Sequence, residues 1–245
     1  MMEPFLGPIF GALILALVFA LGKRIRLVGD RHVRRWISLA AGISVAYVFV
    51  DLLPDLAARQ AEFARALGEN VLFAGKRLYL VALFGFVIFY GLEYMILRSR
   101  HLKEGEAPAG TTDSFFWLHI GGFTLYCWII GYLLVDLAER GAVSLWLYVF
   151  AMALHFSVLD HELRKEHKQA YDRLGCWIMA AGTLLGCVVS LAAPLSEVNF
   201  SRLLALVAGG VVLASSKSEL PKEKEGRFWW FLLGAAFYAI VILLI

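Results

Sequence analysis

The sequence predicts an all-α protein that crosses a lipid bilayer several times, and two observations support this class. Of its 245 residues, 60% are hydrophobic and only 18% are charged, whereas soluble domains hold roughly 45–50% apolar and about 25% charged residues. The apolar residues also form long blocks separated by short charged connectors. Because lipid offers no water to an unpaired backbone group, each block is expected to be a helix. We therefore expect residues 1–245 to form a single integral membrane domain.

Eight apolar blocks have the length of a membrane-spanning helix, which takes about 20 residues. The second and seventh blocks end in charged or polar residues, so the count of eight depends most on these two. The expected spans are residues 5–22, 36–56, 78–97, 114–136, 142–162, 174–194, 200–217 and 227–245.

The positions of the basic residues predict how these spans are oriented, because cytoplasmic loops hold an excess of Lys and Arg. The first, third, fifth and seventh connectors hold 17 of the 23 basic residues, and the other three connectors hold the remaining 6. Both termini are therefore expected outside. No basic residue precedes the first apolar block, so we expect that block to stay as a helix rather than be cleaved as a signal peptide. The compact loops favour a prokaryotic plasma membrane.

The composition also limits the expected partners. The net charge is only +3, which gives little support to nucleic-acid binding. Cys127, Cys176 and Cys187 all fall inside apolar blocks and have no CxxC spacing, so neither a disulfide framework nor a structural zinc site is indicated. The expected partner is the lipid bilayer, no resident cofactor is expected, and a homodimer is left open.

Two connectors are longer than the rest. Residues 56–77 consist of good helix formers, which predicts an outer connector in which the second helix extends beyond the bilayer or lies along its surface. Residues 98–113 contain Gly, Pro and Thr after a charged run, which predicts a flexible cytoplasmic loop.

An internal similarity relates the second block to the seventh. The stretch 41–55, AGISVAYVFVDLLPD, aligns with 208–222, AGGVVLASSKSELPK, at a constant offset of 167 residues. The charge distribution orients the two helices oppositely, as an inverted repeat requires, and such repeats are common in transporters. A proline near the end of each helix either bends the helix or ends it. The identical pairs are Ala41/Ala208, Gly42/Gly209, Val45/Val212, Leu53/Leu220 and Pro54/Pro221.

These residues carry a resemblance to a known family. The stretch from Ala41 through DLLPD at 51–55 resembles the second helix of the ZIP family of divalent-metal transporters. The stretch from Ala208 through ELP at 219–221 is similar to that family's seventh helix, and Gly85 followed by Glu93 is similar to its third. The resemblance implies eight spans, outside termini and an inverted repeat that relates the first three helices to the last three.

The resemblance does not extend to the family's metal-binding signatures. Those are His-Asn-x-x-Asp in the fourth helix and His-Glu-x-Pro-His-Glu in the fifth. Here the fourth helix offers His119, Thr124, Tyr126 and Cys127, and the fifth reads HFSVLDHE over residues 155–162. The resemblance implies a role only for His155, which matches the first histidine of the fifth-helix signature.

Polar residues inside the apolar blocks are the best signal of a site, because charged groups at membrane depth usually face a cavity or a partner. His155 could bind a metal, relay protons or simply donate a hydrogen bond within the bundle. Glu93 and His119 could pair with each other. A Zn²⁺ site needs about four ligands, so a metal site requires the helices to bring the candidates together. The candidate ligands are His155, His119, Asp160, Glu93 and Asp51.

Two further groups lie near the predicted membrane boundaries. Asp51 and Asp55 share a helix face, so they could attract cations to an outer vestibule or merely solvate the end of the helix. Glu162 and its neighbours His161, Arg164 and Lys165 are expected to form a solvated cytoplasmic face.

The leading hypothesis is a ZIP-like transport protein that moves a cation, such as Zn²⁺ or another divalent metal, by alternating access. The alternative is a ZIP-fold membrane protein that no longer transports and acts as a sensor, scaffold or assembly partner. An enzyme is not expected, because no HExxH or GxSxG motif and no paired membrane aspartates are present.

Overall fold

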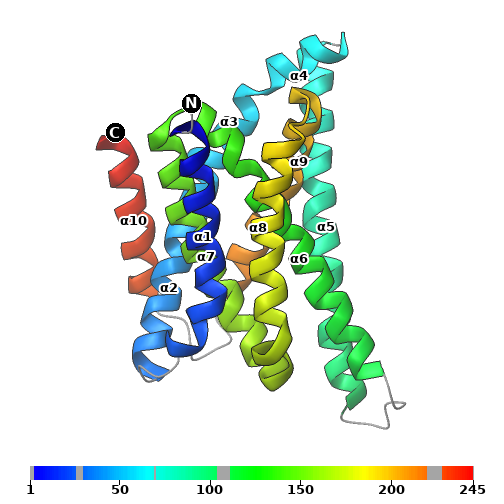
Figure 1. The fold of residues 1–245 in the computed structure, drawn as a ribbon, viewed down its shortest axis with the longest axis vertical. Coiled ribbons are helices and arrows are strands. Elements are labelled where there is room, and N and C mark those ends of the chain that lie inside the picture. The colour runs from blue at the N-terminus through cyan, green and yellow to red at the C-terminus, as the bar shows by residue number, and fades with distance from the viewer. Residues whose placement is uncertain (1–2, 26–29, 69, 104–110, 220–227, 245) are drawn as a thin grey trace.

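A computed structural model describes residues 3–25, 30–68, 70–103, 111–219 and 228–244. In these residues all regular elements are helices, which pack as one bundle (Figure 1), and the predicted all-α class is confirmed. In chain order the elements are α1 (Glu3–Ile25), α2 (Asp30–Tyr47), a π-helical turn (Val48–Leu52), α3 (Leu53–Ala58), α4 (Gln60–Leu67), α5 (Val71–Lys103), α6 (Thr111–Glu139), α7 (Ala142–Ala170), a second π-helical turn (Tyr171–Gly175), α8 (Cys176–Ala192), α9 (Glu197–Glu219) and α10 (Phe228–Leu244).

Several helices are long and apolar enough to cross a membrane. Across the described ranges five helical stretches qualify, and the longest contains both α7 and α8. Helix α10 is apolar but shorter, with 17 residues. The protein therefore has the helices of an integral membrane protein, whereas the count of eight crossings stays a prediction. The qualifying stretches are Leu6–Lys23, Arg35–Leu67, Gly75–Met95, Phe115–Glu139 and Ala142–Ala192.

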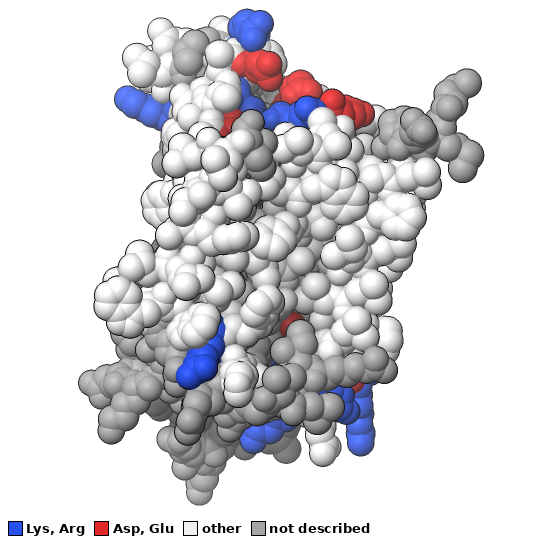
Figure 2. All heavy atoms as spheres, turned by 90° about the vertical axis from the view of Figure 1, so that its left-hand side faces the viewer, with Lys and Arg blue, Asp and Glu red and all other residues white. Residues whose placement is uncertain are grey.

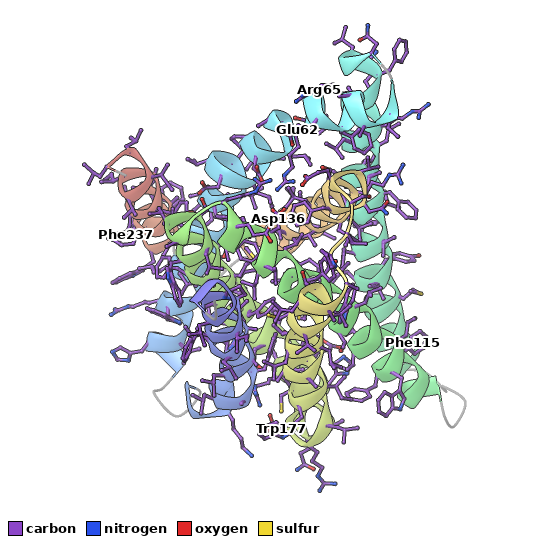
Figure 3. The ribbon with its side chains drawn as sticks, turned by 45° about the horizontal axis from the view of Figure 1, so that its top comes forward. Glu62, Arg65, Phe115, Asp136, Trp177 and Phe237 are labelled. Atoms are coloured by element: carbon purple, nitrogen blue, oxygen red, sulfur yellow. The ribbon has the colours of Figure 1, made fainter. Side chains whose placement is uncertain are left out.

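The surface of the bundle is apolar where a bilayer would surround it. Large hydrophobic side chains point outward from α1, α5 and α10, among them Phe10, Phe84 and Ile240, which are more than half exposed. On the face shown in Figure 2, charged side chains gather toward the two ends and leave a broad uncharged band between them. In Figure 3, Glu62 and Arg65 lie at one end of the bundle and Trp177 lies at the other. Helices that are hydrophobic on their outer faces as well as their inner ones suit lipid rather than water.

Helix α6 forms much of the centre of the bundle. It packs against α8, α7, α1 and α5, and its side chains Ile130, Leu133 and Leu134 are completely buried. The chain reverses direction near the end of α7, at the kink residue Lys168, whose φ of 48° and ψ of −120° leave the helical region. Helix α8 then runs back along the bundle (Figure 1), and α1 packs against both α7 and α8.

Among the described helices, three pairs approach each other closely through glycines: α2 with α10, α5 with α9, and α6 with α8, where a methyl group on Gly131 or Gly186 would lie 2.1 or 2.0 Å from a carbonyl oxygen of the other helix. In the pair α2 and α10, a methyl group on Gly42 would lie 2.1 Å from the carbonyl oxygen of Phe231, and one on Gly234 would lie 2.2 Å from that of Leu39. The absence of a side chain at these positions is therefore what lets the two backbones touch.

The pair α5 and α9 has matching contacts. A methyl group on Gly209 would lie 1.9 Å from the carbonyl oxygen of Ala82, and one on Gly85 would lie 2.2 Å from that of Leu206. A constant spacing of 167 residues in the sequence relates Leu39 and Gly42 of α2 to Leu206 and Gly209 of α9. Phe231 and Gly234 of α10 correspond to Ala82 and Gly85 of α5 at a spacing of 149. In Figure 1 α2 and α9 run in opposite directions along the bundle, as do α5 and α10.

Both long connectors contain helix, which was expected for residues 56–77 as an extension of the second helix or a helix along the surface, but not for residues 98–113. Residues 56–77, predicted as an outer connector, hold the end of α3, all of α4 and the start of α5. Residues 98–113, predicted as a flexible loop, hold the end of α5 and the start of α6, and residues 104–110 between them lie outside the described part of the chain. In both connectors a spanning helix continues past its apolar block, because backbone hydrogen bonds propagate a helix once it has formed.

Pro54 does not end its helix. The π-helical turn Val48–Leu52 lies directly before it, and the chain continues as α3 with the proline in the first turn. Pro54 has no N–H to donate to an earlier carbonyl, so a locally wider turn next to it accommodates the missing hydrogen bond. Its counterpart Pro221 lies outside the described residues.

Candidate functional site

The deepest histidine lies between α6 and α7. The side chain of His155, on α7, is 2% exposed, and its Nε2 lies 3.0 Å from the hydroxyl oxygen of Tyr126 on α6. The ring of Tyr126 also packs edge-on against Phe89 of α5, with 4.9 Å between the ring centroids. His155 is thus held in an aromatic and dry layer in the middle of the bundle. It shares a hydrogen bond with the hydroxyl of Tyr126.

Asp160 lies one and a half helical turns further along α7, in a buried ion pair with Arg164. The Nε of Arg164 donates to the Asp160 carboxylate over 2.7 Å, and the hydroxyl of Tyr171 donates to the same carboxylate over 3.0 Å. Both members of the pair are about 3% exposed. Arg164 also donates to the carbonyl oxygen of Phe19 over 2.6 Å and to Asp172. We refer to this group of residues as the lower charge cluster.

The lower charge cluster joins three parts of the chain. Asp160 and Arg164 come from α7, Asp172 from the π-helical turn before α8, and the carbonyl of Phe19 from α1. Lys23 of α1 adds a weaker ion pair to Asp172 at 3.8 Å. A buried charge is tolerated when its partners satisfy it, and this arrangement holds α1, α7 and the start of α8 together.

His119 lies near the start of α6 and meets a histidine that the sequence did not single out. Its Nδ1 lies 2.7 Å from Nε2 of His167 on α7. The two rings are 5.0 Å apart, and the ring of Phe123 packs against His119. One of the two imidazoles must donate and the other accept, so this contact requires at least one neutral ring.

Asp51 and Glu93 occupy separate places. Asp51, in the π-helical turn after α2, accepts a hydrogen bond of 2.5 Å from the hydroxyl of Tyr238 on α10. Tyr238 packs edge-on against Tyr47, one turn before Asp51. Glu93 lies part-buried on α5.

The predicted metal ligands therefore sit in distinct pairs: His155 with Tyr126, His119 with His167, Asp160 with Arg164, and Asp51 with Tyr238. Within the described residues no three His, Cys, Asp or Glu side chains are grouped so that they could hold one metal ion. Four of the five candidates, His155, His119, Asp160 and Asp51, thus have separate hydrogen-bond partners in this conformation.

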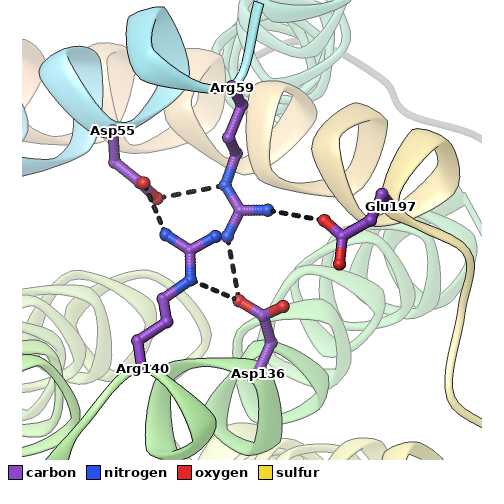
Figure 4. Close-up of polar contacts among 5 residues, drawn as sticks. All are labelled: Asp55, Arg59, Asp136, Arg140 and Glu197. Atoms are coloured by element: carbon purple, nitrogen blue, oxygen red, sulfur yellow. Dashed lines mark hydrogen bonds and ion pairs between the residues drawn. The ribbon is translucent and has the colours of Figure 1, made fainter. Parts of the chain in front are cut away.

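A second charged group lies at the opposite end of the bundle, and Figure 4 shows its five members. Arg59, between α3 and α4, is 2% exposed and pairs with Asp136 of α6 at 2.9 Å, Asp55 of α3 at 3.3 Å and Glu197 of α9 at 3.4 Å. Arg140 pairs with the first two of these carboxylates at 3.0 Å and 2.6 Å. We call this group the upper charge cluster.

The upper charge cluster connects the α3–α4 segment to α6 and α9. The guanidinium of Arg59 also lies over the ring of Phe200 of α9, at 4.2 Å from its centroid. Asp55, expected either to attract cations or to solvate the helix end, instead bridges two arginines. The cluster holds three carboxylates against two guanidiniums, so its formal charge is negative.

The prediction of a solvated face around Glu162 is wrong for Arg164. Glu162 and Lys165 are exposed as expected, but Arg164 points into the bundle. The spacing of four residues between Asp160 and Arg164 was a usable signal, because it places the two side chains on one face of a helix. His167 and Tyr171 reach their partners through the tertiary fold, and no sequence spacing indicated those contacts.

Searches against models of protein families and against curated proteins find no match to this chain. In the described residues, the fold and these clusters define an all-helical protein with apolar helices that could span a membrane and with a charge cluster around a buried arginine toward each end.

Proposed function

We propose that the chain is a ZIP-like membrane transport protein that crosses a prokaryotic plasma membrane eight times, with both termini outside, and moves a cation by alternating access. The observation that carries the proposal is the matching set of glycine contacts. The pair α2 with α10 runs in the opposite direction to the pair α5 with α9. The helices of each pair touch at residues that are equivalent between the two pairs. The same kind of contact joins α6 to α8, so the support comes from the constant spacings of 167 and 149 residues that relate the two pairs and from their opposite directions. An inverted repeat predicts both features, and inverted repeats are a frequent basis of alternating access.

The location of the charge clusters supports the same proposal. The upper charge cluster ties together helices at the end of the bundle where both termini lie, and the lower charge cluster does so at the other end (Figure 1). Between them lies the dry layer with His155 and Tyr126. In this proposal each cluster is a gate that opens in turn, because ion pairs can separate and re-form as helices rock against each other.

A cation would have to displace the present partners of its ligands. The candidate ligands remain His155, His119, Asp160, Glu93 and Asp51, and four of them are hydrogen-bonded to protein groups in this conformation. Binding would therefore accompany a rearrangement of α6 and α7. A divalent metal such as Zn²⁺ fits the imidazole and carboxylate chemistry of the set.

The test is uptake of a panel of divalent ions into proteoliposomes. The native chain is expected to move at least one ion, and His155→Ala and Asp51→Asn are each expected to lower the flux about tenfold or more, as ligand loss does. Cys187→Ala is the matched control, because it changes a buried side chain of α8 away from the polar groups, and it should keep the native flux. The transport proposal is wrong if no ion moves, or if both ligand substitutions leave the flux unchanged.

A second candidate is a ZIP-fold membrane protein that does not transport and acts as a sensor, scaffold or assembly partner. The pairing of Asp160 with Arg164 and Tyr171 favours it, because that carboxylate is already fully used by the fold. The two candidates differ in their response to metal. If divalent ions neither cross the proteoliposome membrane nor change the melting temperature of the purified chain, the second candidate is the better one.

A further inference from the structure

A groove of about 530 Å³ opens on the side of the bundle between α2, α7 and α10. This volume lies within the range of roughly 300–1,000 Å³ that is usual for small-molecule sites. Its walls are largely apolar and include Val33 and Leu39 of α2 and Trp230 of α10, with Trp36 and Arg35 beside them. The groove lies on the outer surface of the bundle, so in a membrane its opening faces lipid.

The groove lies at a boundary between apolar and polar surface. Arg35 is the first residue of the apolar stretch Arg35–Leu67, and Trp230 is the third residue of α10. Trp and Arg side chains at the ends of spanning helices sit at the level of lipid headgroups. This end of the bundle also carries the connectors that are rich in basic residues, and the inner leaflet that such loops face holds the anionic lipids.

The polar part of the groove is positively charged. The guanidinium of Arg35 lies over the ring of Trp230, 5.7 Å from its centroid. Its Nε is buried and has no hydrogen-bond acceptor among the described residues. The groove's described lining also contains no Asp or Glu, whereas it does contain His32. A buried guanidinium N–H without an acceptor is costly, and an anionic group at this place would relieve that cost.

We propose that this groove binds one anionic phospholipid of the inner leaflet, with an acyl chain in the apolar part and the phosphate at Arg35. Phosphate is the anion that a planar guanidinium binds best, because two parallel hydrogen bonds fit its geometry. The hydrocarbon would cover the apolar ring of Trp36, which is 45% exposed. The proposal rests on the proposed orientation of the chain in the membrane, and it holds whether or not the chain transports a cation.

Occupancy of the groove would act on the lower charge cluster. A smaller cavity of about 20 Å³, large enough for one water molecule, shares Val33, Trp36 and Ser157 with the groove and is also lined by Asp160 and Arg164. Figure 2 shows an acidic side chain recessed in the lower half of this face. A bound acyl chain would contact the shared residues Val33, Trp36 and Ser157 from the lipid side, opposite the ion pair. It would thereby hold α2 against α7.

The experiment measures lipid binding to the full-length chain in detergent by native mass spectrometry, with phosphatidylglycerol and phosphatidylcholine as the two probes. The native chain should retain one phosphatidylglycerol with an affinity about fivefold or more above that for phosphatidylcholine, and Arg35→Gln should remove this preference. Arg173→Gln is the matched control. It removes an equally charged, exposed arginine at the same end of the bundle, so the preference should persist.

Trp230→Leu is the second variant, for the case in which Arg35→Gln does not fold. It removes the ring beneath the guanidinium while keeping an apolar side chain, and it should also weaken the preference for phosphatidylglycerol. Glycerol phosphate, which has the headgroup chemistry without acyl chains, should not displace the lipid. The proposal is overturned if the two lipids bind the native chain equally, if Arg35→Gln behaves like Arg173→Gln, or if glycerol phosphate competes as well as the lipid does.

Discussion

At the scale of single residues, the most consequential side chain is Arg59. It is 2% exposed and is the shared partner of Asp55, Asp136 and Glu197. Removing Arg59 would leave Arg140 as the counter-charge of Asp136 and Asp55, and the carboxylates are partly exposed, so the cost should lie between that of an exposed and that of a fully buried ion pair, at about 2 kcal/mol. Arg59→Gln should therefore lower the free energy of unfolding by that amount, measured by SDS-induced unfolding in mixed micelles.

Arg140 provides the comparison for this prediction. It pairs with two of the same carboxylates but is one-third exposed, so water replaces its contacts when it is lost. Arg140→Gln should cost only about 1 kcal/mol. Equal losses from the two substitutions would contradict the view that burial of Arg59 is what gives the upper charge cluster its strength.

Gly22 tests the lower charge cluster in the same way. A methyl group on Gly22 of α1 would lie 2.0 Å from Oδ2 of Asp160, the oxygen that accepts from Arg164. Gly22→Ala must displace this buried and paired carboxylate, and overpacking of this kind costs about 1–3 kcal/mol. The thermal stability of the purified chain measures the effect.

Gly121→Ala is the matched control for Gly22→Ala. Gly121 lies in α6 with no atom within 4 Å of the added methyl group, so this change should be neutral or slightly stabilising, because alanine is the better helix former. If Gly22→Ala is as well tolerated as Gly121→Ala, Asp160 is not fixed in the position described here.

At the scale of helices, the glycine contacts predict two equivalent packing sites. Gly42→Ala would bring a methyl group within 2.1 Å of a carbonyl oxygen of α10, and Gly209→Ala would bring one within 1.9 Å of a carbonyl oxygen of α5. Backbone atoms cannot move aside as side chains can, so each substitution should cost at least about 2 kcal/mol. SDS-induced unfolding of the two single variants measures both costs.

The repeat makes the comparison between these two variants informative. Similar losses are expected if the two helix pairs are related by the proposed repeat, because the two sites have similar contact distances. Gly91→Ala, in α5 but with open space around the added methyl group, should leave stability almost unchanged. A large loss at one glycine and none at the other would argue against the equivalence of the two helix pairs.

The helices were largely predictable from the sequence, whereas their polar contacts were not. Apolar blocks fix where a helix must lie in lipid, which is why the predicted span 142–162 falls inside α7. The same blocks say nothing of how far a helix continues beyond them, so the end of α5 was assigned to a flexible loop, whereas the helix-forming residues of 56–77 indicated the helix there. The Asp160–Arg164 pair follows from a four-residue spacing, but the meeting of His119 with His167 depends on how α6 packs against α7.

At the scale of the whole molecule, the distribution of basic residues predicts which end of the bundle faces the cytoplasm. Exposed arginines lie at both ends. Arg65 of α4 and Arg202 of α9 belong to the end with the upper charge cluster, and Arg173, before α8, belongs to the other end. The excess of Lys and Arg in alternate connectors places Arg173 inside and the other two outside. The three native cysteines are buried, so new cysteines at these exposed positions can be labelled against a low background.

A membrane-impermeant maleimide should therefore label Arg65→Cys and Arg202→Cys in intact cells, and should label Arg173→Cys only after the membrane is opened.

Because Arg65 and Arg202 are separated in the chain by α5 through α8, their labelling from one side requires an even number of crossings between them. Labelling of Arg65→Cys without Arg202→Cys would mean an odd number of crossings between the two positions. The inverted repeat would then be wrong, because it needs α2 and α9 to cross the membrane in opposite directions. Labelling of Arg173→Cys alone in intact cells would keep the repeat but reverse the orientation of the whole molecule.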